Sequence, residues 1–270
     1  MMMPIRCSAA IRSALVATFT ALPLAAQQQP SPQPATAFTL SIARVIQNGP
    51  PITVDFRGIT AGGTARLEVT GGTDAAGFPA GTWLLISDTS GAARLVDTVH
   101  RTIRSIGAGA RLGGIVELHT PPGVVSDVAV TLDTLGAGEV IEGRATRRYR
   151  VTTHFSLTMT SGTGKSGAAQ STSVTDLWQA DGPERIPNPF VGLGGGETPD
   201  DFLAPLNRLL VETARGLPGL TLRSETHATL SARGVTITSQ QVSTRLSGLR
   251  RAVADPASLQ VPSGFIAPPD

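Results

Sequence analysis

The segment from Gly143 to Thr160 constrains the fold of this chain more than any other feature, because its side chains alternate in polarity. The odd positions from 149 are Tyr149, Val151, Thr153, Phe155, Leu157 and Met159, and the even positions from Arg148 to Thr160 are all polar. Side chains of a β-strand point alternately to its two faces. The segment therefore predicts one long strand, spanning roughly 40 Å, in a large twisted antiparallel sheet with one polar face.

The first 26 residues have the pattern of a secretory signal peptide. Arg6 and Arg12 precede the short apolar stretch 14–26, and Leu24-Ala25-Ala26 places small residues before Gln27. We therefore expect cleavage near Ala26 and export to the periplasm or the extracellular space.

Two further regions follow this signal. Residues 27–35 are rich in Pro and Gln and are expected to form a disordered leader. Residues 36–270 are expected to form a single β-rich domain, which is large enough to be stable through its own apolar core.

The charge and cysteine content exclude several classes of function. The full chain has 22 Lys+Arg and 20 Asp+Glu, and removal of Arg6 and Arg12 with the signal leaves a mature chain of zero net charge. Such a chain lacks the basic surface of a nucleic-acid-binding protein. The single cysteine, Cys7, also lies in the signal, so the mature chain has no disulfide, thiolate nucleophile or cysteine-ligated metal.

Shorter alternating segments occur on both sides of the long strand, with Gly, Pro, Asn and Ser turns between them. They are Phe38–Ile46, Ile52–Arg57, Ala65–Thr70, Gly81–Asp88, Ala93–Asp97, Val124–Leu132, Ser173–Ala180, Leu220–Ala232 and Gly234–Ser239. Short connections join antiparallel neighbours. The fold class is therefore mainly β (α+β): a large curved antiparallel sheet with one or two covering helices.

One helix is predicted over Asp200–Arg215, with leucines at helical spacing and Gly216 at its end. Pro205 should either kink this helix or mark where its regular part starts. A weaker helical turn is expected within Thr98–Ile106. The tail, Pro256–Asp270, is expected to be a short edge strand or an extended segment.

Motifs with known chemistry are incomplete in this chain. The segment Gly162–Ser166 lacks the first glycine of a phosphate-binding loop and joins two strands, which favours a hairpin tip. His154 and His227 fall on the polar faces of their strands and would converge, with Glu225 or Asp176, only if those strands were neighbours. We therefore expect no catalytic residue, no metal, no cofactor and no enzymatic activity.

Seven large apolar residues are candidates for a ligand site. They share the feature that they would lie on the apolar face of the sheet or on the predicted helix: Trp83, Tyr149, Phe155, Trp178, Phe202, Leu206 and Leu209. Either they fill a core, or they line an apolar groove between sheet and helix, where small ligands bind.

A series of short segments gives the chain a resemblance to a known family. They are Gly81-Thr82-Trp83-Leu84-Leu85, Leu135-Gly136-Ala137-Gly138-Glu139, Asp176-Leu177-Trp178-Gln179-Ala180, Gly216-Leu217-Pro218 and Val261-Pro262-Ser263-Gly264-Phe265. In this order they resemble an uncharacterised family of bacterial envelope proteins with a domain of unknown function, related to the LolA-like lipoprotein-carrier half-barrels. The resemblance extends from about Gly81 to the end, with departures at Arg144 and Gly219. It implies a curved half-barrel capped by helices, which in the carriers holds acyl chains, and it brings no catalytic residues.

These observations lead to two hypotheses. The first is an exported, non-catalytic envelope protein that binds a hydrophobic, lipid-like ligand between sheet and helix. The second is a structural or interaction module of the envelope, with a filled core, whose sheet edges bind another envelope protein. Neither involves nucleic acid, and the chain is not expected to span a membrane, because its strands lack aromatic girdles.

Overall fold

The computed structural model describes residues 31–72, 81–87, 93–106, 123–160, 166–182, 186 and 204–266. The predicted signal peptide and the first four residues of the predicted leader lie outside the described residues.

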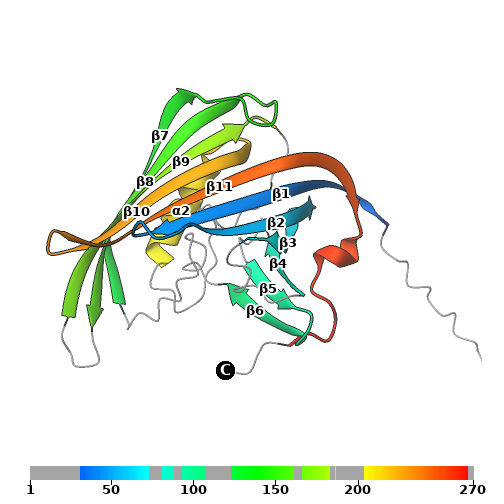
Figure 1. The fold of residues 1–270 in the computed structure, drawn as a ribbon, viewed down its shortest axis with the longest axis horizontal. Coiled ribbons are helices and arrows are strands. Elements are labelled where there is room, and N and C mark those ends of the chain that lie inside the picture. Colours follow the sequence, from blue (N-terminus) through cyan, green and yellow to red (C-terminus); the bar gives the residue numbers. More distant parts are fainter. Residues whose placement is uncertain are drawn as a thin grey trace, which may run out of the picture.

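The described residues form one antiparallel sheet of eleven strands (Figure 1). In chain order the strands are β1 (Gln33–Ile46), β2 (Ile52–Ala61), β3 (Thr64–Gly71), β4 (Thr82–Ser87), β5 (Ala93–Asp97), β6 (Thr102–Ile106), β7 (Gly123–Ala137), β8 (Thr146–Thr160), β9 (Ser166–Ala180), β10 (Leu220–Ala232) and β11 (Val235–Ala254). Their spatial order is β6-β5-β4-β3-β2-β1-β11-β10-β9-β8-β7. The fold class predicted from the alternating segments is confirmed.

Two meanders meet in the middle of this sheet. Strands β1 to β6 pair in succession, as do β7 to β11, and β1 pairs with β11 to join the halves. In that pairing Leu40 stands opposite Leu246 and Ile42 opposite Thr244. The first and last strands are therefore central, and the edges are β6 and β7. The long strand β8 lies second from an edge.

The ends of several elements differ from the sequence predictions. β1 begins at Gln33, so the last three residues of the predicted leader belong to the sheet. Residues 98–101 form a turn that leads into β6, so the helical turn expected there is wrong. β11 continues to Ala254, far beyond the alternating segment Gly234–Ser239. β8 and β9 are antiparallel neighbours with Thr160 opposite Ser166, and residues 162–165 of the predicted hairpin tip lie outside the described residues.

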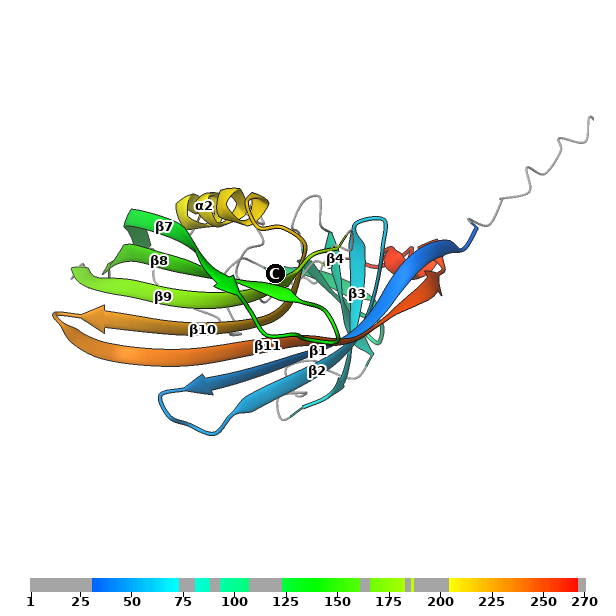
Figure 2. The same cartoon turned by 90° about the horizontal axis from the view of Figure 1, so that it is seen from above.

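The described helices are the α-helix α2 (Ala204–Arg215) and the short 3-10 helix η2 (Pro256–Leu259). Pro205 lies in the first turn of α2, where its missing N–H removes no helical hydrogen bond, and residues 200–203 of the predicted helix lie outside the described residues. Figure 2 shows the sheet curving around α2, and we call the side that faces α2 the concave face. No helix within the described residues has the length and apolar content needed to cross a membrane.

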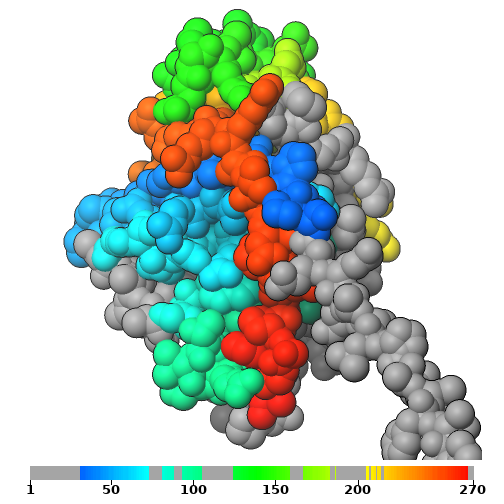
Figure 3. Space-filling view, turned by 90° about the vertical axis from the view of Figure 1, so that its right-hand side faces the viewer, coloured from blue at the N-terminus to red at the C-terminus, as the bar shows by residue number. Residues whose placement is uncertain are grey.

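The C-terminal segment lies against the half of the sheet that β1 to β6 form. Figure 3 shows it beside the strands near β6. Leu259 of η2 packs with Ala61 and Ala254, and Arg66 donates a hydrogen bond to the carbonyl of Ser258 (3.2 Å). Ile266 forms a bridge to Thr102 of β6. The tail, expected to be an edge strand or extended, therefore begins with a 3-10 turn and then joins the edge of the sheet.

Candidate functional site

An apolar cluster lies between α2 and the concave face of the sheet, and we call it the helix cluster. Its buried members are Tyr149 and Val151 of β8, Leu177 of β9, and Leu206 and Leu210 of α2. Its half-buried members pack against them: Val125, Val128, Val130, Leu132, Phe155 and Leu217. The apolar row predicted for the long strand therefore does face the helix.

The local sequence of α2 explains how it covers this face. Leu206 and Leu210 are one helical turn apart and project from the same side, while Arg208 and Glu212 are exposed. The hydroxyl of Thr213 donates to the carbonyl of Leu209 (2.8 Å) in the last turn. The helix thus presents one apolar side to the sheet and one charged side to solvent.

A β-bulge in β7 supplies more apolar side chains to the same cluster. The register with β8 shifts between Ser126 and Ala129, and Asp127 has a left-handed backbone (φ 53°). Strict alternation would place Val125 and Val128 on opposite faces, but both pack on the helix cluster. The bulge therefore widens the apolar surface beside α2.

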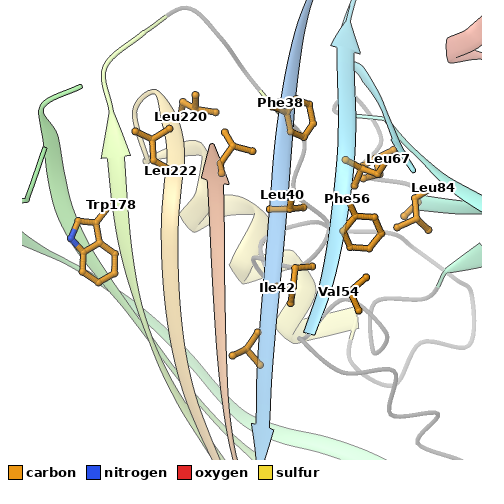
Figure 4. Packing of buried hydrophobic residues seen from close by; sticks show 14 of the residues in the cluster. Phe38, Leu40, Ile42, Val54, Phe56, Leu67, Leu84, Trp178, Leu220 and Leu222 are labelled. Carbon is orange, nitrogen blue, oxygen red and sulfur yellow. The ribbon is translucent and has the colours of Figure 1, made fainter. Parts of the chain in front are cut away.

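A second apolar cluster, the central cluster, occupies the middle of the sheet (Figure 4). Leu40, Phe56, Leu67 and Leu222 are among its fully buried members. On β2, Gly58 stands opposite Phe38, whose ring occupies the space that a side chain would need. A Cβ at Gly58 would lie 2.2 Å from Phe38 Cζ, so this position requires glycine.

The structure brings together only some of the seven predicted site residues. Tyr149, Phe155 and Leu206 lie in the helix cluster, and Leu209 is half-buried on the same helix. Phe202 lies outside the described residues. Whether the residues of this cluster bind a ligand stays a prediction.

Trp83 and Trp178 do not lie beside α2, because the register places both on the opposite, convex face. Directly opposed residues of neighbouring strands share a face. Trp178 stands opposite Arg148, which belongs to the polar row of β8. Trp83 stands opposite Glu68 on β3. Leu177 and Trp178 are adjacent apolar residues, so alternation alone left the face of Trp178 undecided.

Charged side chains bury Trp178 on the convex face. The guanidinium of Arg148 lies 5.0 Å from the ring centroid and that of Arg223 lies 4.5 Å from it. Arg223 also pairs with Glu139 and Glu225. These cation–π contacts let a large aromatic ring be covered on a polar face.

Asp176 lies among the charged side chains on the same convex face. Its carboxylate accepts hydrogen bonds from Arg150 Nε (2.7 Å) and Nη2 (3.0 Å), and a further bond from Arg148. The hydrogen bond from Arg150 is the main reason that the pKa of Asp176 is lowered, and Arg148 acts in the same direction against the effect of burial. Both oxygens of the Asp176 carboxylate therefore already accept hydrogen bonds from neighbouring arginines.

Trp83 has a similar environment in the other half of the sheet. The guanidinium of Arg66 lies 4.3 Å from its ring centroid, and Glu68 pairs with both Arg57 and Arg66 at 2.7 Å. The hydrogen bond from Arg57 is the largest cause of the lowered pKa of Glu68. Both tryptophans are therefore packed under arginines, and Trp178 also belongs to the central cluster.

The histidines on the long strands do not meet. His154 is on β8 and His227 on β10, with β9 between them. His154 Nδ1 contacts the hydroxyl of Thr172 (3.2 Å), and His227 stands opposite Val174. Within the described residues no group of three His, Cys, Asp or Glu side chains is arranged to hold a metal ion.

Comparisons with known proteins were made at three levels. No protein-family model matches the chain, and no curated protein matches it. Among solved structures it is similar to a LolA superfamily protein from Nitrosomonas europaea, with 8% identity, a TM-score of 0.33, and coverage of 85% of this chain and 91% of that chain. It is also similar to a DUF1329 family protein from Desulfovibrio piger, with 10% identity, a TM-score of 0.33, and coverage of 86% and 92%. These are the kinds of protein that the sequence resembles. At such a TM-score the likeness transfers no ligand and no activity.

Proposed function

We propose that this protein binds a hydrophobic, lipid-like ligand between the concave face of its sheet and α2. The observation that carries the proposal is the set of half-buried apolar side chains that pack against the helix cluster, on the bulged strand β7 and at Phe155 and Leu217. A binding surface leaves such side chains partly exposed, so that a ligand can cover them.

The position of α2 supports entry of a ligand. The helix packs chiefly on β7, which is an edge strand of the sheet. Moving the helix outward would expose Leu206 and Leu210, at a cost of roughly 3–6 kcal/mol if each loses about 1.5–3 kcal/mol of burial. An acyl chain recovers about 0.8 kcal/mol for each methylene that it buries. About four to eight methylenes would therefore offset the opening, so a common fatty acyl chain is long enough.

The binding test uses two neighbouring residues of β8 that point to opposite faces. Phe155 belongs to the helix cluster, whereas His154 lies on the convex face. Phe155→Ala should weaken binding of a fluorescent fatty acyl probe by roughly five- to tenfold through lost apolar contact, and His154→Ala should leave it unchanged. The unmodified protein should also yield co-extracted lipid by mass spectrometry. Absence of both lipid and probe binding contradicts the proposal and leaves the interaction module as the alternative.

We also propose that the protein acts outside the cytoplasm. The support is the signal-like pattern of residues 1–26. Expression of the full chain in a bacterial host should yield an exported protein whose mass corresponds to a chain beginning at Gln27. A protein of full-length mass that stays in the cytoplasm would contradict this part of the proposal.

A further inference from the structure

Three pairs of hydroxyl side chains cross the concave face between β8 and β11. In each pair the two residues stand directly opposite one another on neighbouring strands, with their oxygens within hydrogen-bond distance. The pairs are Thr153 with Ser173 (2.6 Å), Thr175 with Thr226 (3.0 Å) and Ser224 with Thr244 (2.7 Å). Each pair is displaced from the one before by one strand and two residues, so we call the six residues the hydroxyl line.

The hydroxyl line separates the two apolar clusters. The middle pair lies in a row of directly opposed residues that crosses four strands, Val151–Thr175–Thr226–Val242. Val151 at one end of this row belongs to the helix cluster, and Val242 at the other end belongs to the central cluster. Because neighbouring strands are about 4.8 Å apart, roughly 14 Å separate these two valines. The other two rows are Leu177–Ser224–Thr244–Ile42 and Val130–Thr153–Ser173–Ala228. The concave face therefore presents a polar line with apolar surface on both sides.

The pairing leaves hydrogen atoms available for donation. A hydroxyl has one hydrogen to donate, and in a pair one oxygen donates to the other, so the accepting hydroxyl keeps its own hydrogen. Thr175 and Thr226 of the middle pair are half-buried. Among the described residues, neither of these side chains has a second hydrogen-bond partner. The middle pair thus offers a neutral donor to a molecule on the concave face.

We propose that the hydroxyl line binds the carbonyl oxygen of an acyl ester whose apolar arms extend toward the helix cluster and the central cluster. This rests on the proposed function and narrows its ligand class from apolar molecules in general to esters with apolar groups on both sides of the carbonyl. An ester carbonyl accepts a hydrogen bond and carries no charge, which matches a neutral donor between two apolar surfaces. An ether of the same length fills the same space but lacks this acceptor.

The test compares two probes on three forms of the protein. The probes are a decyl ester of pyrenyldecanoic acid and the ether of the same chain lengths, with pyrene fluorescence as the readout. The variant Thr175→Val with Thr226→Val removes both hydroxyls of the middle pair and keeps their shape. Its control is Thr131→Val with Thr152→Val, an opposed threonine pair on the convex face of β7 and β8. Thermal unfolding of all three forms verifies that each is folded.

The unmodified protein and the control should bind the ester roughly three- to tenfold tighter than the ether, the effect of one net hydrogen bond. The Thr175→Val, Thr226→Val variant should bind both probes with equal affinity. If both probes bind but their affinity ratio is the same in all three forms, the role of the hydroxyl line is refuted and apolar binding remains. If neither probe binds to any form, the proposed function fails, and this inference with it.

Discussion

Replacement of Asp176 tests whether the convex face is stabilised as the structure indicates. The residue is 8% exposed and accepts three hydrogen bonds from Arg148 and Arg150. Asp176→Asn keeps the shape of the side chain but removes its charge. Hydrogen bonds to charged groups contribute about 1.5–3 kcal/mol each. The arginine side chains are 38% and 41% exposed, so water compensates for part of the loss. We therefore expect a total loss of about 2–3 kcal/mol in the free energy of unfolding at pH 7.

The same variant has a defined pH dependence. The pKa of Asp176 is lowered from its ordinary value of 3.8, chiefly by the hydrogen bond from Arg150. A group with a depressed pKa stabilises the folded state above the unfolded pKa, and this contribution is lost as pH falls through the folded pKa. The difference between the unmodified protein and Asp176→Asn should therefore be complete at pH 7 and shrink as pH falls below 3.8.

Urea unfolding at a series of pH values measures this difference, with Asp133→Asn as the control. Asp133 is an exposed carboxylate on the edge strand β7, opposite the same Arg150. Its replacement should change the free energy of unfolding by less than about 0.5 kcal/mol. A loss below about 0.5 kcal/mol for Asp176→Asn at pH 7 would refute the reasoning, as would a larger loss that is independent of pH.

Two further substitutions test the two apolar clusters. Gly58→Ala should lower the free energy of unfolding by about 1–3 kcal/mol, because the new methyl group collides with the ring of Phe38, while Gly167→Ala in open space should cost far less. Leu206→Ala should cost about 2–5 kcal/mol through the cavity left under α2, and the exposed Arg208→Ala should stay within about 0.5 kcal/mol. Equal effects of a substitution and its control, measured by urea unfolding, would contradict the assigned packing.

Most of the strands were predictable from the sequence, and their order was not. The alternation in β8 is local, and it indicates both the length of the strand and the face that meets α2. The position of β8 near an edge depends on the pairing of β1 with β11, whose residues lie about two hundred positions apart. No local sequence pattern indicates a pairing between strands that lie so far apart in the chain.

For a related reason, only some residues of the candidate site could be predicted from the sequence. Tyr149 and Phe155 follow from the alternation of one strand, whereas Trp178 needed the register with Arg148. The hydroxyl line was not predicted from the sequence, although Thr153 interrupts the apolar row of β8. That interruption was the available signal, because a polar residue on a buried face needs a hydrogen-bond partner, which here is Ser173.

Photo-crosslinking with a diazirine-bearing fatty acyl probe tests the central claim most directly, because it locates the ligand as well as detecting it. Peptide mapping should find saturable labelling on α2 and on Phe155 or its neighbours on the concave face of β7 and β8, displaced by an excess of unlabelled lipid. Labelling that does not saturate, or that maps to the convex face around Trp178, would contradict a lipid site between the sheet and α2.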